Sequence, residues 1–214
     1  ADFKSMKFDT YDNVEMPTLI LKHLNGEVIC SIGYYINFQT VFRFNDVSEI
    51  NFEVPAEHNG VVNSYYKEVK GMRIVCVEGM GDFVIVNPQI NNNGKREVKQ
   101  CKAYSLEYLF NFKKIGLPKG TYNFYNPADN KDSMMTILTE KMPDWSVGSV
   151  DEELIGKWRT FDAVNDKLYT FMMGTLQHIY ECLFLFDTKN KKINDKSHWI
   201  QWNKCTMVGE YCFS

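Results

Sequence analysis

The side chains that most often carry acid–base or metal chemistry are few in this sequence and far apart. Histidine is the usual general acid or base near neutral pH and a frequent metal ligand. The four histidines do not form a set of ligands at loop or helix spacing; they are His23, His58, His178 and His198. His178 has Glu181 near it, but one histidine with one glutamate does not define a general acid–base pair.

The six cysteines are scattered and lack a Cys-x-x-Cys pair, so a zinc site is not expected. Several lie in apolar runs, as Cys76 does in Ile74–Val77, which favours small buried side chains in a reducing compartment over a disulfide framework. The sequence also lacks a zinc-peptidase motif, a nucleophile elbow, a phosphate-binding glycine loop and a dinucleotide fingerprint. We therefore assign no catalytic, cofactor-binding or metal-ligating residue and expect no cofactor.

Two weaker signals could still support carbohydrate chemistry. The first is the acidic run 151–153. Glycosidase carboxylates must face one another across a cleft, and adjacency in sequence does not supply this arrangement. The run precedes Leu154, so we interpret it as the acidic start of a helix, where carboxylates stabilise the helix dipole. Scattered aromatic side chains usually pack in cores, yet some could stack on sugars. The candidates are Trp145, Trp158, Trp199, Trp202 and Tyr125.

The composition predicts a folded globular chain. Of its 214 residues, 44% are hydrophobic, 14% aromatic and 24% charged, which excludes a disordered or collagenous chain. The net charge of −3 disfavours a general electrostatic grip on nucleic acid or anionic lipid. The most apolar stretch, 169–186, is interrupted by polar residues and is shorter than the ~20 residues of a membrane span. We expect neither a membrane span nor sequence-specific nucleic-acid binding.

Strand patterns dominate the first hundred residues. Asn25-Gly26 suits a type I′ turn between two strands, and Glu78–Gly81 separates another pair. A short helix is expected at 61–69. The expected strands are 19–24, 27–30, 36–44, 49–54, 72–77, 82–90 and 95–103. This half predicts an antiparallel barrel or sandwich.

The remainder mixes helices and strands. Apolar spacings of three and four predict a helix at 133–141 and another at 164–180, with Asp162 as the cap of the second. Strands are expected at 157–161, 182–186 and 191–193. The sequence therefore predicts an α+β chain: a β-rich, tube-like domain at 1–103, a smaller mixed α/β domain at 104–194, and an atypical tail at 195–214.

Several strings, in this order and spacing, resemble the amino-terminal structural region of bacteriophage and prophage tail hub proteins, the tail-associated lysin or prophage endopeptidase tail family. The resemblance covers roughly 17–193. The strings are 25–29, 42–55, 79–85, 101–108, 158–162 and 179–188.

The resemblance implies a scaffold around a tail-tube-like β-barrel that joins the tail tube to the tip and helps close the DNA channel. It implies a trimer in the full-length protein, whose partners are the tail tube, the distal tail protein and the tape measure. The location it implies is the virion tail, and the host cytoplasm before assembly. A second tube domain is expected beyond this sequence. Residues after Ile193 depart from the family's expected return strand, which a truncation, a frameshifted gene end or a designed fragment would each explain.

The leading hypothesis is a non-enzymatic structural component of a tail tip or baseplate hub. The aromatic run 34–44 would supply more apolar contact than one barrel interior uses, either to neighbouring subunits or to two cores of one subunit. The alternatives are a tail-associated peptidoglycan hydrolase or peptidase, whose lytic module is expected in a carboxy-terminal region, and a module that binds carbohydrate on the host surface.

Overall fold

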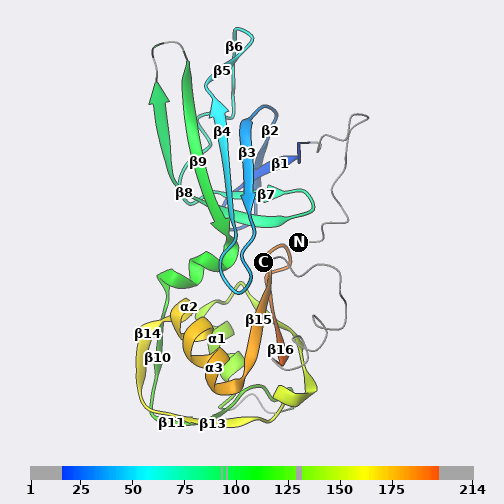
Figure 1. The fold of residues 1–214 in the computed structure, drawn as a ribbon, viewed down its shortest axis with the longest axis vertical. Helices are drawn as coiled ribbons and strands as arrows, with labels where there is room; N and C mark the ends of the chain where they lie inside the picture. Colours follow the sequence, from blue (N-terminus) through cyan, green and yellow to red (C-terminus); the bar gives the residue numbers. More distant parts are fainter. Residues whose placement is uncertain (1–15, 93, 95, 129–131, 198–214) are drawn as a thin grey trace. The chain divides into compact units, whose positions relative to one another are not determined.

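The structure is a computed structural model that describes residues 16–92, 94, 96–128 and 132–197. The chain forms two compact units, which divide in sequence between Tyr108 and Leu109. The domain boundary expected from the sequence lay five residues earlier, after residue 103. Each unit has its own sheets (Figure 1).

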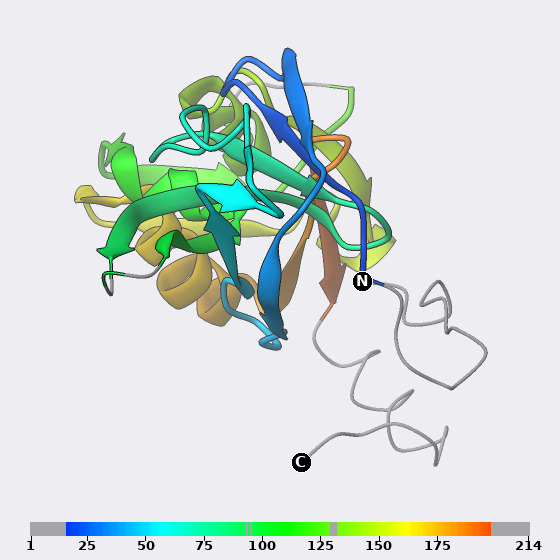
Figure 2. The same ribbon diagram turned by 90° about the horizontal axis from the view of Figure 1, so that it is seen from above.

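The first unit is built on one seven-stranded antiparallel sheet in the order β2-β1-β7-β8-β9-β4-β3. Its strands are β1 (Leu19–Lys22), β2 (Val28–Ile32), β3 (Ile36–Val41), β4 (Glu49–Pro55), β7 (Ile74–Val77), β8 (Gly81–Asn92) and β9 (Glu97–Ser105). A separate small hairpin consists of β5 (Glu57–His58) and β6 (Val61–Val62). The blue-to-green strands of this unit do not lie in one plane (Figure 2).

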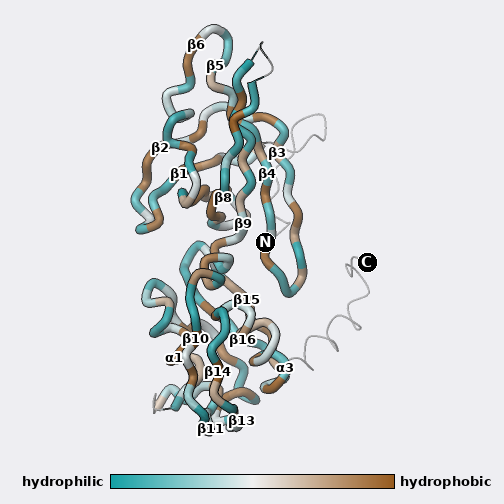
Figure 3. The backbone as a smooth tube through the Cα atoms, turned by 90° about the vertical axis from the view of Figure 1, so that its left-hand side faces the viewer, coloured by the Kyte–Doolittle hydropathy of each residue, from teal (hydrophilic) through white to brown (hydrophobic). Residues whose placement is uncertain are grey.

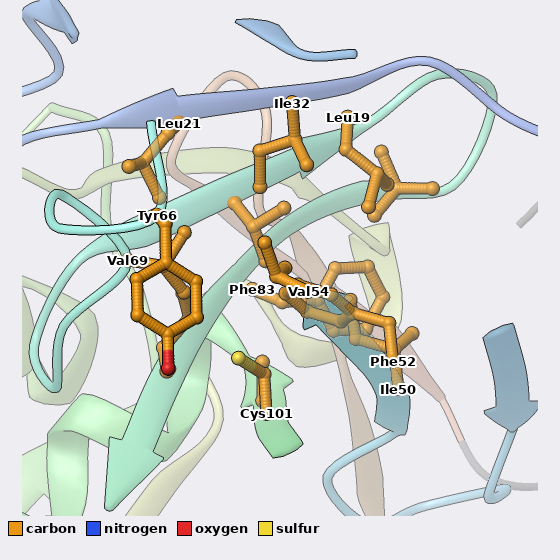
Figure 4. Close-up of a cluster of buried hydrophobic side chains, with 14 residues drawn as sticks. Leu19, Leu21, Ile32, Ile50, Phe52, Val54, Tyr66, Val69, Phe83 and Cys101 are labelled. Atoms are coloured by element: carbon orange, nitrogen blue, oxygen red, sulfur yellow. The ribbon is translucent and has the colours of Figure 1, made fainter. Parts of the chain in front are cut away.

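The sheet curls around a single hydrophobic core. Leu19 and Leu21 of β1 join the same buried cluster as Phe52 of β4, with Phe83 of β8 between them (Figure 4). In a flat sheet, β1 and β4 would lie roughly 19 Å apart, because four inter-strand spacings separate them. Only a curved sheet lets these side chains share one core.

The curled sheet does not close into the expected barrel. β2 and β3 are the two edge strands, and among the described residues neither pairs with the other. They are joined by only three residues, Gly33–Tyr35, so one end of each edge lies near the other. Tyr35 donates a side-chain hydrogen bond to the carbonyl oxygen of Pro17, just before β1. Among the described residues the sheet is thus curled and open, with β2 and β3 as its edges.

The alternation of apolar residues and the turn residues predicted these hairpins correctly, but they did not predict every turn type. β1 pairs with β2 and β7 with β8, as expected. Gly26 has a φ of 90°, whereas Asn25 does not have the positive φ that a type I′ turn requires. Instead the Asn25 side chain accepts a hydrogen bond from the Glu27 amide at 3.1 Å, and the ladder shifts register at the end of β1. The type I′ assignment was wrong.

The expected helix at 61–69 is also wrong. Val61 and Val62 form β6, and the segment after it makes successive turns, with Tyr66 N–H bonded to Asn63 and Glu68 N–H to Tyr65. Two carbonyls of this segment accept hydrogen bonds from the buried ammonium of Lys99, at 2.6 Å for Tyr66 and 2.9 Å for Val69. A lysine on β9 therefore satisfies carbonyls that a helix would have paired internally.

The second unit is mixed α and β. Its strands form two ribbons, β10–β14 and β11–β13, and a three-stranded sheet in the order β12-β16-β15. The strands are β10 (Lys114–Leu117), β11 (Gly120–Asn123), β12 (Ser146–Val150), β13 (Trp158–Phe161), β14 (Val164–Lys167), β15 (Cys182–Asp187) and β16 (Lys192–Ser197). The helices are α1 (Met134–Lys141), α2 (Leu168–Thr170) and α3 (Gln177–Tyr180), with a π-helical turn at Phe171–Leu176 and 3₁₀ turns at Leu106–Phe112 and Glu152–Leu154.

The helix expected at 164–180 begins four residues late. Residues Val164–Lys167 form β14 and pair with β10. Asp162 does not cap the helix, since its carboxylate lies 2.9 Å from the ammonium of Lys119. The continuous helical segment 168–180 contains a π turn, and it ends at Glu181, whose φ of 56° is left-handed. The helix α1 was predicted correctly.

Two cations of the second unit hold the carboxyl end of this helix. Lys157 donates to the carbonyl of Tyr180 at 2.6 Å, and Arg159 donates to that of Ile179 at 3.1 Å. Both interactions satisfy terminal carbonyls and complement the negative end of the helix dipole. Tyr180 is buried and donates to the carbonyl of Tyr122 at 2.8 Å, which ties the helix to β11.

Part of the expected atypical tail belongs to the fold. Asp195–Ser197 complete β16, which pairs antiparallel with β15 and parallel with β12. Residues 198–214, the rest of that predicted tail, lie outside the described residues. Among the described helices, none is long and apolar enough to cross a membrane.

Candidate functional site

The described histidines lie in three separate places. His23 contacts the guanidinium of Arg73 beside the β1–β2 turn, and His178 is exposed on α3. The ring of His58 stacks on Tyr34 with centroids 3.6 Å apart. His198 lies outside the described residues. The described histidines, cysteines and carboxylates include no group able to hold a metal ion.

The acidic run 151–153 does start a 3₁₀ turn, as a helix start was expected there, but Asp151 acts elsewhere. Its carboxylate accepts hydrogen bonds from the ammonium of Lys196 at 2.8 Å and from the amide of Ser197 at 2.9 Å. It therefore fastens the turn to β16. Glu152 and Glu153 are exposed.

Two carboxyl groups are buried, and burial sets their protonation. Asp195 on β16 is fully buried, and neither of its oxygens has a hydrogen-bond partner. Burial, with a smaller contribution from Asp151, raises its pKa well above the usual range. Burial likewise raises the pKa of Glu107 to about 7, against the hydrogen bond it accepts from Ser105 at 2.5 Å. Sequence patterning gave no sign of either group.

The described cysteines are free thiols, as expected, and burial makes them poor nucleophiles. Burial raises the pKa of Cys101 to about 12 and raises that of Cys182 further. The pKa values of the Cys30 and Cys76 thiols are also raised, mainly by burial. Cys205 and Cys212 lie outside the described residues. A thiolate at neutral pH is therefore disfavoured at all four described positions.

The aromatic candidates for sugar stacking separate clearly. Trp145 is buried against Phe110 and Phe186, with ring centroids 5.0 and 6.0 Å away, so it is a core residue. Trp158 on β13 is 50% exposed, and Tyr125 is half-buried. Trp199 and Trp202 lie outside the described residues. Of the five, Trp158 alone among the described residues offers a largely open ring.

Two threonine hydroxyls lie on the same face of the β11–β13 ribbon as Trp158. Thr160 lies two residues along the same strand, and its hydroxyl is 3.0 Å from that of Thr121, its partner on β11. Both threonines are exposed. Residues two apart on a strand share a face, so the indole and the two hydroxyls are on one side of the ribbon.

The aromatic run 34–44 is divided between core and surface. Tyr35 and Phe38 pack against the core of the first unit, with ring centroids 5.8 Å apart. Phe44, in the β3–β4 loop, is 78% exposed. The run does not form one strand, because β3 ends at Val41.

The two edge strands of the first unit, β2 and β3, contain no charged residue. β2 reads Val-Ile-Cys-Ser-Ile and β3 reads Ile-Asn-Phe-Gln-Thr-Val. The inner strand β4 carries two glutamates, and β9 carries Glu97, Lys99 and Lys102. Soluble proteins usually place charges or prolines on exposed edges, because unpaired edges invite pairing with another chain. Here the edges carry none.

Two hairpins of the first unit present further apolar side chains. Ala56 N–H bonds to Glu97, so the β5–β6 hairpin starts beside the β8–β9 hairpin. Val61, Val62 and, on β8, Ile90 are each more than 60% exposed. Figure 3 shows the hydrophobic colour at β6. The sequence assigned 61–62 to a helix and so missed this feature.

No family model matches the chain, and no curated protein is similar to it in sequence. Solved structures are similar in fold. The prophage tail protein gp18 from Listeria monocytogenes EGD-e has a TM-score of 0.62 at 14% identity, over 86% of this chain and 51% of its own. The 43 kDa tail protein of prophage MuSo2 from Shewanella oneidensis has a TM-score of 0.56 at 10% identity, over 84% of this chain and 53% of its own.

A tail protein from Neisseria meningitidis MC58 has a TM-score of 0.52 at 9% identity, over 84% of this chain and 50% of its own. The chain therefore spans about half the length of the solved structures it matches. At these identities the comparison concerns the fold. The chain has the fold of phage and prophage tail proteins, which confirms at that level the resemblance read from its sequence.

Proposed function

We propose that this chain is a structural component of a phage or prophage tail and acts through its surfaces. The observation that carries the proposal is the shared fold with three tail proteins over at least 84% of the chain. The uncharged edges β2 and β3 and the exposed apolar hairpins support a role in assembly, since such features mark interaction sites.

Within the tail, we place the chain at the tip or baseplate hub, where it joins the tube to the tip and helps close the DNA channel. The curled seven-stranded sheet supports this placement because a ring of such sheets can continue a tube. The partners in this proposal are the tail tube, the distal tail protein, the tape measure and, in the full-length protein, two further copies in a trimer. The chain would reside in the host cytoplasm before assembly.

Purified particles test this proposal. Particles released after induction should contain the protein by mass spectrometry, and antibody labelling in electron micrographs should mark one end of the tail. A deletion of the gene should yield particles without tails or without tips. Normal infectious particles from the deletion strain would contradict the proposal.

We further propose that the chain has no catalytic activity of its own. The high pKa values of its described thiols and the scatter of its described histidines support this reading. The competing proposal, a tail-associated peptidoglycan hydrolase or peptidase, predicts clearing of cell walls in a zymogram by the isolated 214-residue chain. Clearing above the level of a buffer control would reject the non-enzymatic reading.

A carbohydrate-binding role is favoured by one observation, the half-exposed Trp158 with two threonine hydroxyls on the same face. Aromatic rings can stack on the apolar face of a sugar while hydroxyls bond to its rim. Glycan-array binding that is lost in Trp158→Ala but kept in Trp145→Phe, a conservative core change, would support it. Absence of binding in the unchanged protein would reject it.

A further inference from the structure

Two polar side chains of the sheet β12-β16-β15 are buried without a hydrogen-bond partner. Asp195 and Ser197 lie two residues apart on β16, so they share one face of the strand, and both are buried. Both carboxyl oxygens of Asp195 and the hydroxyl of Ser197 lack a partner among the described residues. A buried polar group that makes no hydrogen bond lowers the stability of the fold, so these three atoms require a physical explanation.

The strands on either side of Asp195 offer no group that could balance a negative charge. On β15, Phe184 lies directly opposite Asp195, and Cys182 lies opposite Ser197. Both of these β15 residues are buried. On β12, Val150 lies opposite Asp195, and the whole of that strand reads Ser-Val-Gly-Ser-Val. A carboxylate at this place would therefore be buried without a donor or a cation to compensate its charge.

Among the described residues, the charged group that acts on Asp195 is another carboxylate, that of Asp151. Asp151 accepts hydrogen bonds from the ammonium of Lys196 at 2.8 Å and from the amide of Ser197 at 2.9 Å. Its own amide donates to the carbonyl of Asp195 at 3.2 Å. Lys196 thus pairs with Asp151, and the two acids of the adjacent 3₁₀ turn, at 152 and 153, are exposed.

These surroundings keep Asp195 uncharged while the sheet is closed. Burial, and to a smaller extent repulsion from Asp151, raises the pKa of Asp195 well above its usual range. Burial, with a smaller contribution from Asp195, also raises the pKa of the Cys182 thiol. A carboxyl group that meets water returns to its ordinary pKa and ionises near neutral pH. Loss of the Asp195 proton is therefore coupled to the access of water to this face of β16.

We propose that Asp195 is a pH-dependent switch of the sheet β12-β16-β15, which stays closed while the carboxyl group keeps its proton and opens locally when the proton leaves. Opening means that water reaches the buried face of β16 at Asp195 and Ser197. The unpartnered hydroxyl of Ser197 favours opening at every pH, and the hydrogen bonds of Asp151 to Lys196 and Ser197 oppose it. The switch acts within the second unit and does not depend on the proposed tail function.

The direction of the switch follows from proton binding. The closed sheet holds a proton that the open sheet releases, so a rise in pH favours opening. Between the ordinary pKa of the carboxyl group and its raised pKa in the closed sheet, each unit of pH should increase the equilibrium constant for opening about tenfold.

The thiol of Cys182 can report this opening, because it is fully buried and lies opposite Ser197. Alkylation by iodoacetamide is measured at pH 6, 7 and 8 in the unchanged chain and in Asp195→Asn, with mass spectrometry to read each cysteine separately. Dividing the two rates at each pH removes the pH dependence of the thiol itself. The quotient for Cys182 should rise about tenfold per pH unit. The quotient for Cys101, which is buried in the first unit, should stay at about 1.

Three further measurements separate the switch from other effects. Glu153→Gln removes an exposed carboxylate close in sequence to Asp151 and should keep the pH dependence of the unchanged chain. Ser197→Ala removes an unpartnered hydroxyl and should slow alkylation of Cys182 about fivefold at each pH without changing its slope. Hydrogen exchange in α1 should not follow the alkylation of Cys182, because the opening is local. If circular dichroism shows that Asp195→Asn does not fold, Asp195→Ser takes its place.

Four results would overturn the inference. The first is a quotient for Cys182 that does not change with pH, and the second is a loss of the pH dependence in Glu153→Gln. The third is a quotient for Cys101 that rises with that for Cys182, and the fourth is exchange in α1 that rises in parallel, since each would indicate unfolding beyond the sheet. Particle composition tests the tail function separately, so either proposal can fail while the other stands.

Discussion

At the scale of single residues, Glu107 shows that the place of a carboxyl group in the fold determines its protonation more than its residue type does. It follows β9 and accepts a hydrogen bond from Ser105, whose hydroxyl in turn accepts one from the Ser48 amide. Its second carboxyl oxygen is buried without a partner. A carboxylate in such a place loses hydration that one hydroxyl cannot replace, so the neutral acid is favoured. Burial accordingly raises the pKa of Glu107 to about 7.

The resulting pH dependence has a definite sign. Because the folded pKa of about 7 exceeds the ordinary value of 4.5, the folded state holds the proton over that range and the unfolded chain does not. The free energy of unfolding should therefore fall as the pH rises from 4.5 through 7, by about 3 kcal/mol from this group. Glu107→Gln should remove this fall and be the more stable form at pH 8.

Urea unfolding at pH 5, 6.5 and 8 measures the effect. Glu78→Gln, a change at an exposed position, is the matched control and should keep the slope of the unchanged protein. Equal slopes in the protein and in Glu107→Gln would show that this carboxyl does not carry the proton.

Lys99 presents the opposite case, a buried cation that is held by well-placed acceptors. Its ammonium bonds to two carbonyls and lies 4.2 Å from the centroid of the Tyr66 ring. Burial lowers its pKa, yet the loss of its side chain would leave the carbonyls of Tyr66 and Val69 buried and unpaired. Lys99→Met should lower the free energy of unfolding by about 2 kcal/mol.

The exposed Lys67, in the same segment, supplies the comparison. Lys67→Met should change stability by less than about 0.5 kcal/mol, as surface substitutions usually do. Guanidinium unfolding of both variants measures the difference. If both substitutions had the same small effect, the hydrogen bonds of Lys99 would not stabilise the turns at 63–69.

At the scale of elements, the helix 168–180 ends at a residue type that its backbone disfavours. Glu181 is left-handed with a φ of 56°, a conformation that costs a residue with a Cβ roughly 1 kcal/mol relative to glycine. Its side chain also pairs with Lys157 at 3.1 Å, but the carboxylate is about half exposed and such pairs contribute little. Glu181→Gly should stabilise the protein by about 0.5 kcal/mol.

The same substitution inside α1 should have the opposite sign. Glu140 is exposed in that helix, where glycine costs roughly 1 kcal/mol. Thermal unfolding of the two variants should therefore show a higher midpoint for Glu181→Gly and a lower one for Glu140→Gly. Two downward shifts would show that the ion pair with Lys157 outweighs the backbone strain.

Local sequence signals predicted elements where short-range preferences and packing agree. The alternation in 72–77 and 82–90 and the apolar spacing in 133–141 gave β7, β8 and α1. The signals failed where a distant residue decided the outcome. Lys99 donates hydrogen bonds to carbonyls after β6. Pairing with β10 makes Val164–Lys167 a strand, where the start of a helix was expected. Neither partner is close in sequence, so periodicity could not report them.

The two open edges of the sheet were missed for a related reason. The run 34–44 reads as one aromatic strand, whereas in the structure Tyr34 and Tyr35 are tied to Tyr65, His58 and Pro17. The partners are distant in sequence, so local patterning could not report these contacts. A short connection between two uncharged strands was the available signal, since Gly33 marks a break between them.

At the scale of the whole molecule, the net charge distinguishes a scaffold that lies beside DNA from a protein that binds DNA. The chain has 24 basic and 27 acidic residues, so its long-range field does not attract a polyanion. Non-specific binding to duplex DNA is driven by counterion release, which requires lysines and arginines that neutralise several phosphates. Several of the described lysines and arginines already face a carboxylate, as Lys22 does with Asp82 at 3.2 Å and Lys102 does with Glu49 at 3.1 Å.

We therefore expect fluorescence anisotropy with labelled duplex DNA to show no saturable binding below a protein concentration of about 100 µM at 150 mM salt, the weak end of non-specific affinities. A variant with Glu49→Gln and Asp82→Asn frees two lysines and shifts the net charge from −3 toward −1. It should bind measurably better at low salt if the acidic balance is what excludes DNA. Tight, salt-dependent binding by the unchanged chain would instead indicate a basic surface that grips the nucleic acid, and a DNA conduit lined by such a surface would hinder passage.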